Sequence, residues 1–406
     1  MTSPAGSTRR RTGAGRGKAR AAVRIGVIGL GMGAMHARML RDGKVPGGVL
    51  TAVCDLLPAR LAPWRDVAGV HCFDDADALL RSDVVDAVLV ATPHYAHTTL
   101  GIAALQHGLH LLVEKPISVH KADCERLIAA HVDPTRVFAA MFNQRTDPYF
   151  RHIRELLQGG TLGAVQRVNW IITDWFRPEA YYRSGGWRAT WAGEGGGVLM
   201  NQCPHNLDLM CWLFGLPVRV RAFAGFGKHH DIEVEDEVTA YLEYANGATG
   251  VFVASTGEAP GTNRLEVTCD GGRLVYEHDV LTLTRNATLT SEFSRSTRER
   301  FAAPATTTEV FSWPDHGGQH LAVLQNFVAA IAQGTPLVAP AAEGIHSVEL
   351  ANAMLLSAAK SRSVDLPLDA AAYARHLKRL VANSRGVRPD ADAASVSDLA
   401  RSFPRK

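Results

Sequence analysis

Residues 23–36 read VRIGVIGLGMGAMH, and the prediction of the fold starts from this stretch. Its apolar run, 23–28, stops at a cluster of glycines, and apolar residues return at helical spacing over 35–40. This pattern predicts a buried strand, a tight turn and a helix. We interpret it as the first βα unit of a doubly wound parallel sheet that binds a dinucleotide.

The glycines of the predicted turn, GLGMGA at 29–34, have different physical functions. Gly29 permits a sharp exit from the strand, and Gly31 lets the backbone approach a pyrophosphate that the N–H groups of the helix N-terminus would bind. Met32 and Gly33 complete the loop, although Gly33 comes one position earlier than in the usual G-x-G-x-x-G spacing. Alone, such a string could also be an ordinary turn.

Asp55 favours the dinucleotide interpretation. A second short apolar segment, 49–54, ends at this acid, about twenty residues beyond the glycine loop, where a ribose hydroxyl acceptor is expected. A carboxylate there repels the additional phosphate of NADP, so we expect NAD as the cofactor. Arg60 lies close enough in sequence to keep NADP as the less favoured alternative.

Composition indicates a globular protein of two domains, or three by length alone, because the chain has 406 residues and 46% of them are hydrophobic. The longest apolar runs fall short of the roughly eighteen residues of a membrane helix, so we expect no membrane partner. Six cysteines are scattered without a C-x-x-C pair, which argues against zinc and against a disulfide framework. We expect a cytoplasmic protein without a bound metal.

The formal net charge of +3 comes from the start of the chain. Residues 1–20 carry six Lys and Arg and no acids, and without them the remainder has a net charge of −3. We predict that 1–22 form a disordered basic extension. Because no aromatic residues interleave with these arginines and the remainder is acidic, we expect no nucleic-acid partner.

Further segments predict a Rossmann domain over 23–142. Strands are expected at 70–73, 87–91, 110–113 and 136–141, with helices between them. The carboxyl ends of such strands face the ligand crevice.

Candidate cofactor contacts therefore follow the strand at 87–91. We expect Thr92, Pro93 and His97 near the nicotinamide half of the cofactor, whereas His94 could equally lie on a surface loop.

A charged pair follows the strand at 110–113. Glu114 and Lys115 stand immediately before Pro116, which delivers two charged groups to the mouth of the sheet. A lysine fixed there can orient a substrate hydroxyl or share its proton, whereas one on a solvated loop would be unremarkable.

Residues 143–370 have the pattern of a second, α+β domain. Apolar residues alternate over several segments, which predicts an open, predominantly antiparallel sheet: 165–172, 218–226, 237–244, 249–255 and 264–269. Residues 285–310 are assigned no element. Helices are expected at 320–332 and 342–359, and 371–406 should contain one more helix and a polar tail. The fold class is thus α/β, a Rossmann domain followed by an α+β domain.

Between the first two of these strands, residues 174–215 alternate aromatic rings with arginines. Trp187 and Arg188 belong to this stretch and suit a sugar-like ring, although the stretch could instead be an oligomer interface. We expect a helix to start at 195–197 and to carry Asn201, His205 and Asp208 on one face, since they are spaced by four and three.

Over about residues 23–370, the chain resembles the Gfo/Idh/MocA oxidoreductases. The resemblance rests on the glycine loop, the ATPHYAH turn at 91–97, the EKP triplet at 114–116 and the glycine-led segment that ends at His205. It implies a Rossmann domain, an open-sheet domain used for dimers or tetramers, and oxidation or reduction of sugars and polyols with NAD(P). It also implies that Lys115 contacts the substrate hydroxyl and the nicotinamide ribose and that His205 is catalytic, and we count Glu114 and Lys115 among the expected cofactor contacts. The family often has aspartate where this chain has Asn201.

We therefore predict an NAD-dependent enzyme that transfers a hydride to or from a secondary hydroxyl of a cyclic polyol, sugar or glycoside. Lys115, His205 and Asn201 are the expected catalytic residues, and Arg145, Trp187 and Arg188 are further expected substrate contacts. Two alternatives use the same cofactor: a glycoside hydrolase that oxidises its substrate transiently, and a non-catalytic regulator that binds NAD. We expect a homo-oligomer.

Overall fold

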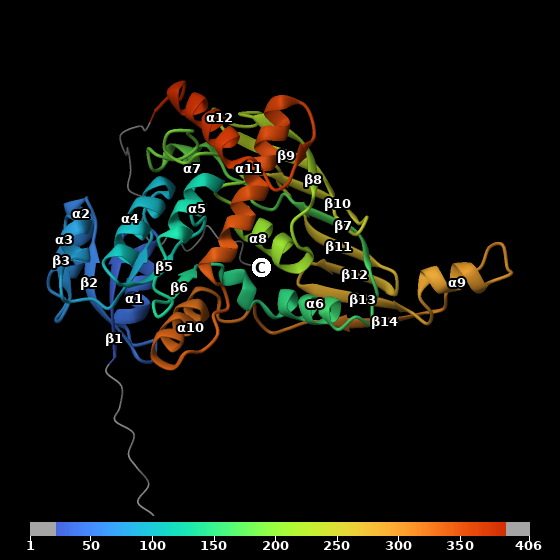
Figure 1. The fold of residues 1–406 in the computed structure, drawn as a ribbon, viewed down its shortest axis with the longest axis horizontal. Helices are drawn as coiled ribbons and strands as arrows, with labels where there is room; N and C mark the ends of the chain where they lie inside the picture. The colour runs from blue at the N-terminus through green and yellow to red at the C-terminus, as the bar shows by residue number, and fades with distance from the viewer. Residues whose placement is uncertain (1–21, 387–406) are drawn as a thin grey trace, which may run out of the picture.

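The computed structural model describes residues 22–386, which are built around two β-sheets (Figure 1). The predicted basic extension, 1–22, lies outside the described residues except for its last position, and so does the end of the predicted polar tail, 387–406.

The first sheet has six parallel strands in the order β3-β2-β1-β4-β5-β6. Their bounds are β1 Val23–Ile28, β2 Gly48–Cys54, β3 His71–Phe73, β4 Ala87–Val90, β5 His110–Val113 and β6 Phe138–Ala140. The strand order reverses between β1 and β4, which opens a crevice at their carboxyl ends. The prediction of a doubly wound parallel sheet is confirmed.

Helices cover both faces of this sheet. Those within its own stretch of sequence are α1 Gly33–Arg41, α2 Pro58–Leu61, η1 Ala62–Trp64, α3 Ala76–Leu80, α4 His94–Gln106 and α5 Lys121–Ala129. A late helix, α10 (Gln319–Gln333), returns to pack on α1, and its Phe327 shares a buried apolar cluster with Ile25 and Val27 of β1. The first sheet is therefore completed by residues from the far end of the chain.

The second sheet has nine strands in the order β14-β13-β12-β11-β7-β10-β9-β8-β15. Their bounds are β7 Val165–Ile172, β8 Arg219–Phe226, β9 Glu235–Glu243, β10 Thr249–Ser255, β11 Asn263–Cys269, β12 Gly272–Glu277, β13 Val280–Asn286, β14 Thr306–Phe311 and β15 Val364–Asp365. All pairs are antiparallel except β7 with β10. The predicted open, predominantly antiparallel sheet is confirmed. The unassigned stretch 285–310 contributes the end of β13, the projecting α9 (Thr290–Ser296) and the start of β14.

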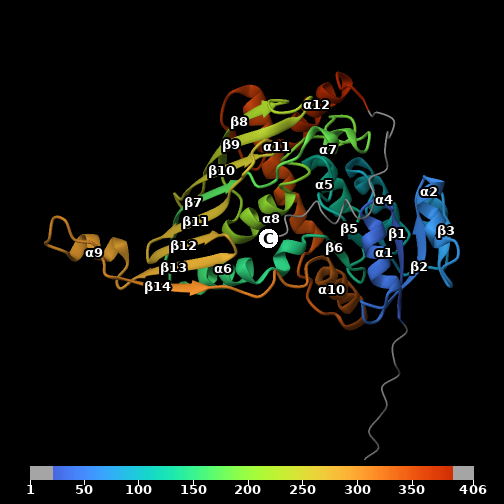
Figure 2. The same cartoon turned by 180° about the vertical axis from the view of Figure 1, so that it is seen from behind.

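One layer of helices lies between the two sheets, as Figures 1 and 2 both show. The remaining helices are η2 Asn143–Thr146, α6 Pro148–Gln158, α7 Glu179–Arg183, α8 Pro204–Phe214, η3 Ala341–Glu343, α11 Gly344–Lys360 and α12 Ala370–Ala382. Helix α11 packs against α8, β8 and α5, and α12 also packs on α5. This layer joins the inner face of the second sheet to the first sheet in one apolar core.

The helix expected to start at 195–197 begins instead at Pro204. The segment before it forms turns, because Cys203 N–H donates to the carbonyl of Val198, five residues back, at 2.8 Å, and Pro204 has no N–H to bond the carbonyl of Met200. Val198 N–H and Leu199 N–H bind Glu235 of β9 at 2.9 and 3.0 Å, which ties these turns to the second sheet. Asn201 therefore lies in a loop, and only His205 and Asp208 lie on α8.

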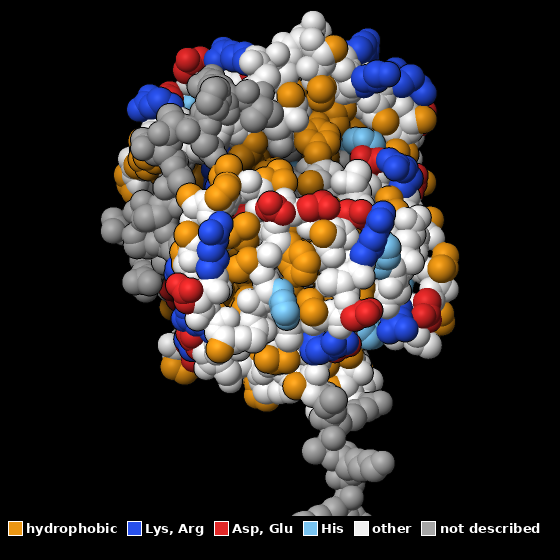
Figure 3. All heavy atoms as spheres, turned by 90° about the vertical axis from the view of Figure 1, so that its left-hand side faces the viewer, with side chains coloured by type: hydrophobic (Ala, Val, Ile, Leu, Met, Phe, Trp, Pro, Cys, Tyr) orange, Lys and Arg blue, Asp and Glu red, His pale blue; other side chains and the backbone are white. Residues whose placement is uncertain are grey.

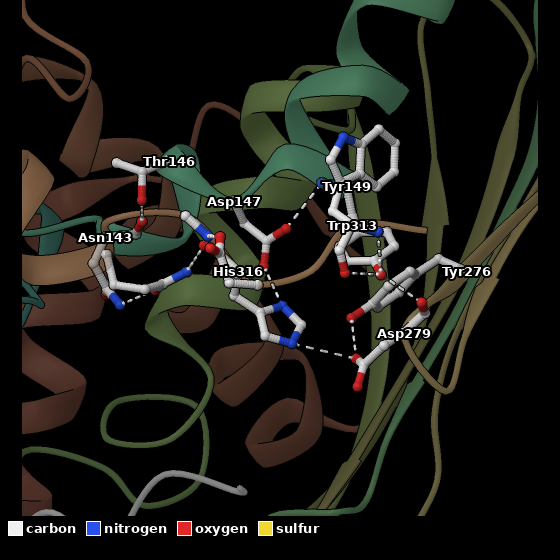
Figure 4. A network of polar contacts seen from close by, with 11 residues as sticks. Asn143, Thr146, Asp147, Tyr149, Tyr276, Asp279, Trp313 and His316 are labelled. Carbon is white, nitrogen blue, oxygen red and sulfur yellow. Dashed lines mark hydrogen bonds and ion pairs between the residues drawn. The ribbon is translucent and has the colours of Figure 1, made fainter. Parts of the chain in front are cut away.

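A polar network ties the second sheet to the segment that leads into α10 (Figure 4). His316 contacts Asp147, the N-cap of α6, at 2.8 Å, and Asp279, in the turn between β12 and β13, at 3.5 Å. Tyr149 OH donates to the carbonyl of Asp279 at 2.5 Å. These contacts hold the segment just before α10 against the second sheet, and α10 runs from there to the first sheet.

Among residues 22–386, no helix is both long and apolar enough to cross a membrane.

Candidate active site

A cavity of about 1040 Å³ lies between the carboxyl ends of the first sheet and the loop that precedes α8. Two walls enclose it. The strand-end wall comprises residues 29–32, 55, 92–97 and 114–115, and the loop wall comprises 175–205. Most of the predicted site residues line it: Gly29, Gly31, Met32, Asp55, Thr92, Pro93, His97, Glu114, Lys115, Trp187, Arg188, Asn201 and His205.

The glycines of the strand-end wall differ in what surrounds them. Gly29 has a φ of +90°, and a Cβ there would lie 2.7 Å from the carbonyl oxygen of Ala91, so the strand can leave the sheet only with glycine. A Cβ on Gly31 would meet only Arg60, at 4.0 Å, which leaves its backbone open to the cavity. Gly33 does not line the cavity, because it faces Val27 across the helix–strand contact, where a Cβ would approach to 2.9 Å.

Asp55 stands at the end of β2, beside the glycine loop. Its carboxylate is 7% exposed and accepts hydrogen bonds from Leu30 N–H at 2.7 Å and Leu57 N–H at 2.9 Å. Arg60 pairs with the same carboxylate at 3.4 Å. The open backbone at Gly31 and the acid at the end of β2 fit the pyrophosphate and the ribose of a dinucleotide.

Glu114 is held by a histidine from the stretch that begins the fold. Its Oε1 lies 2.7 Å from Nε2 of His36, and its Oε2 accepts Lys115 N–H at 3.1 Å. Burial acts to raise the pKa of Glu114, but the hydrogen bond and charge of His36 outweigh it and hold the pKa at about 2. Glu114 is thus a fixed negative charge beneath Lys115.

Two buried histidines, His94 and His97, connect separate backbone segments around the cavity through hydrogen bonds. His97 Nδ1 lies 2.8 Å from the carbonyl of Pro116, and its Nε2 lies 2.7 Å from that of Thr92. Burial lowers the pKa of His97, and a neutral ring has only one N–H to donate to these two acceptors. His94, which could have been a surface residue, is buried, and its Nδ1 donates to the carbonyl of Glu194 at 3.2 Å.

Lys115 reaches across the cavity from the strand-end wall to the loop wall. Its ammonium donates to the backbone carbonyl of Asn201 at 2.8 Å. Burial lowers the pKa of Lys115, Glu114 and Glu194 oppose that effect, and Arg188 adds to it. The side-chain amide of Asn201 donates in turn to Glu194.

His205 lies in the first turn of α8 and is 4% exposed. Burial, together with the charges of Lys115 and His320, holds the pKa of His205 well below its ordinary value, so the imidazole is neutral. Within residues 22–386, its Nδ1 is buried without a hydrogen-bond partner. A neutral imidazole beside an ammonium in one cavity can accept a proton from a hydroxyl that the ammonium polarises.

Rings and guanidinium groups make up the rest of the loop wall. The guanidinium of Arg188 lies 4.8 Å from the ring centre of Trp187 and 4.6 Å from that of Tyr181, and it donates to the Tyr181 hydroxyl at 2.7 Å. His94 meets Trp187 edge to face with 5.3 Å between ring centres. Aromatic faces with hydrogen-bonding groups between them suit a polar ring such as a sugar.

Arg145 does not join this group, contrary to the expectation of a substrate contact. Its side chain is 2% exposed and does not line the cavity. It donates to both oxygens of Asp208, at 2.8 and 2.6 Å, and to Glu343 at 2.5 Å. Asp208, the third residue of the predicted helical face, is therefore committed to this ion pair and not to His205.

Sequence reasoning missed one residue that lines the cavity, His320, and one that lies behind it, Glu194. His320, at the start of α10, lines the cavity although it is remote in sequence from the glycine loop, and burial and the charge of His36 lower its pKa to about 4. Glu194, behind Asn201, is 2% exposed. Nothing local to His320 signals its place, whereas Glu194 stands directly before the glycines of the predicted active-site segment.

Comparison with known families matches both parts of the chain. A family model described as "Oxidoreductase family, NAD-binding Rossmann fold" (GFO_IDH_MocA) matches residues 23–141. A second, the "GFO/IDH/MocA C-terminal domain", matches residues 150–275.

Individual relatives match over most of their length. The chain is 27% identical to the myo-inositol 2-dehydrogenase of Thermotoga maritima, over 85% of this chain and 98% of that protein. It is 25% identical to the levoglucosan dehydrogenase of Pseudarthrobacter phenanthrenivorans, over 75% and 83%. A crystal structure of the WlbA dehydrogenase from Chromobacterium violaceum, in complex with NADH and UDP-GlcNAcA, is similar with a TM-score of 0.72 at 25% identity, over 86% of this chain and 97% of that one.

Proposed function

This chain belongs to the Gfo/Idh/MocA family of NAD-binding oxidoreductases, and we propose that it transfers a hydride between NAD and a secondary hydroxyl of a cyclic polyol, sugar or glycoside. One observation carries the proposal. Lys115 from the first sheet and His205 from α8 line the same cavity as the glycine loop and Asp55.

In the proposed mechanism, a nicotinamide bound along the strand-end wall supplies the hydride acceptor. Lys115 stabilises the negative charge that develops on the substrate oxygen, and the neutral imidazole of His205 accepts the hydroxyl proton. Asn201 orients a neighbouring hydroxyl. Trp187 and Arg188 hold the ring against the loop wall, where stacking and hydrogen bonds fix which carbon faces the nicotinamide.

The names of the relatives support a ring-shaped substrate. The two relatives described above are named for an inositol and for levoglucosan, both cyclic and rich in hydroxyls. The aromatic and arginine groups of the loop wall have the chemistry that such a ring requires.

We propose that the protein is a homo-oligomer that uses the outer face of the second sheet. Large apolar side chains stand exposed on β7, β9 and β8, which lie within one run of four neighbouring strands, β7-β10-β9-β8: Ile171 is 37% exposed, Tyr241 43% and Phe223 62%. Such a patch is typical of a subunit interface. Acidic and basic side chains are interspersed on the visible face of the first-sheet region (Figure 3), which agrees with small-molecule substrates rather than nucleic acid. All six cysteines are free, which supports a reducing, cytoplasmic location.

The proposal is tested by incubating the protein with inositols, free pyranoses and glycosides, with NAD and NADP separately, while NADH or NADPH absorbance is followed. We expect at least one ring to produce NADH, and NAD to be preferred. Release of an aglycone without accumulation of NADH would identify the transiently oxidising hydrolase instead. Tight NAD binding with no turnover of any ring would identify the regulator.

A further inference from the structure

Glu194 is a buried acid behind the loop wall that the proposed mechanism does not use. It is 2% exposed and stands one residue before the glycines that lead to Asn201. Its Oε2 accepts Ala189 N–H at 2.7 Å, and its Oε1 accepts the side-chain NH₂ of Asn201. Burial raises the pKa of Glu194, and the charge of Arg188 and these two hydrogen bonds oppose the rise.

These contacts fix which way the amide of Asn201 points. Because its NH₂ group donates to Glu194, its Oδ1 faces the other way, where Tyr181 OH approaches it at 3.4 Å. Both Tyr181 and Asn201 line the cavity. The Oδ1 of Asn201 is therefore the acceptor that can meet a substrate hydroxyl, while its NH₂ group is turned toward Glu194.

The same contacts account for asparagine at position 201, where the family often has aspartate. An aspartate there would place a second carboxylate against Oε1 of Glu194, and two buried carboxylates at that separation cannot both ionise. The amide removes this conflict and satisfies the acid with a hydrogen bond. In this chain the negative charge is on Glu194, one side chain further from the cavity than an aspartate at position 201 would be.

We propose that Glu194 is a positioning residue that orients Asn201 and supplies, from behind it, the negative charge that keeps Lys115 protonated in the cavity. The inference deepens the proposed function and rests on it for the role of Lys115. Asn201 links the two groups directly, because its backbone carbonyl accepts the Lys115 ammonium and its amide donates to Glu194.

Several other groups act on Lys115, and the test must separate Glu194 from them. The titratable or charged groups that face Lys115 are Glu114, Arg188, Cys203, His94, His97, His205 and His320. Glu114 is the other carboxylate among them, and it is already paired with His36.

The first experiment measures the protonation of Lys115 without turnover. The native protein and Glu194→Gln are acetylated with a trace of acetic anhydride across a range of pH, and labelling of Lys115 is quantified by mass spectrometry against exposed Lys44. Removing the nearby carboxylate should lower the labelling midpoint of Lys115 by about one pH unit. An unchanged midpoint would overturn the inference, whether or not the protein turns over any ring.

The second experiment restores the charge from the other side of the hydrogen bond. The variant Glu194→Gln should lose roughly tenfold in kcat, with the alkaline limb of its pH profile moved to lower pH. The double variant Glu194→Gln/Asn201→Asp should recover most of both losses. If the double variant recovered neither kcat nor the position of the alkaline limb, Glu194 would not be the source of the charge.

Two further variants keep the test decisive. Asn201→Asp alone, which restores the residue common in the family, places beside Glu194 a second carboxylate that must share one proton with it, so the site keeps its negative charge and the labelling midpoint of Lys115 should not fall below that of the native protein; a midpoint lowered by about one pH unit would overturn the inference even if Glu194→Gln does not fold. Glu233→Gln is the matched control, because Glu233 accepts Trp191 N–H at 2.6 Å and so anchors the same loop from outside the cavity. The same shift of the Lys115 midpoint in this control would show that loop integrity, and not the charge of Glu194, is responsible.

Discussion

The two walls of the cavity are built in different ways. The strand-end wall consists of residues that directly follow β1, β2, β4 and β5, either in turns or at the start of α4, so each of them is placed by the strand before it. The loop wall consists of a long segment that is irregular apart from α7 and the start of α8, and it is placed by hydrogen bonds to distant residues such as Glu233 and Glu235. The comparison teaches that the residues of the strand-end wall follow from local sequence, whereas those of the loop wall depend on tertiary structure.

The largest expected effect tests whether the two walls act together. Lys115→Ala removes the only ammonium that joins the walls within residues 22–386, and we expect kcat to fall by roughly 10²- to 10⁴-fold. NADH affinity, measured by fluorescence titration, should change little because the glycine loop and Asp55 are untouched. An equal loss of NADH affinity would mean that Lys115 serves the cofactor and not the reaction.

The next-largest expected effect tests whether Arg145 stabilises the fold or contacts the substrate. Arg145→Met leaves the buried carboxylate of Asp208 without its partner, and the free energy of unfolding should fall by about 3–5 kcal/mol in a denaturant titration. The control Arg167→Met removes a pair with Glu266 in which the arginine side chain is 51% exposed, and it should cost less than about 1 kcal/mol. If Arg145→Met instead raised KM at unchanged stability, Arg145 would be a substrate contact after all.

A pair of glycine variants tests the strand-end wall. Gly29→Ala combines a positive φ with a contact to a backbone carbonyl, so it should destabilise the fold by about 1–3 kcal/mol and also weaken NADH binding. Gly31→Ala meets no close neighbour within the protein, so it should weaken NADH binding while the melting temperature stays near that of the native protein. Equal losses of stability in the two variants would refute this division.

The smallest effect concerns the choice of nucleotide. Asp55→Asn removes the charge that opposes a 2′-phosphate and leaves Arg60 nearby, so the preference for NAD over NADP in kcat/KM should fall by about tenfold. Arg60→Ala in the same background should reduce the NADP activity again. An unchanged preference in Asp55→Asn would place the determinant elsewhere in the cavity.

Sequence alone predicted the strand-end wall better than the loop wall, for physical reasons. Asp55 and Lys115 follow apolar strands directly, so periodicity fixes their place at the edge of the sheet. The spacing of Asn201 to His205 predicts one helix for both, but Pro204 has no N–H to bond the carbonyl of Met200 and Cys203 N–H bonds Val198, five residues back, so the helix begins only at Pro204. Nothing in the sequence around Arg145 indicates that it pairs with Asp208. The two residues are 63 positions apart, and an ion pair over that separation leaves no local pattern.

The return of α10 to the first sheet has a consequence for how this protein can be divided. The helix supplies Val323, Leu324, Phe327 and Val328 to the apolar cluster that β1 and α1 begin. A fragment that stops before α10 would leave that cluster open to water, so we expect it to be prone to aggregation. The nucleotide-binding half is therefore not a portable module, and engineered chimaeras that exchange it should carry 319–333 along with it.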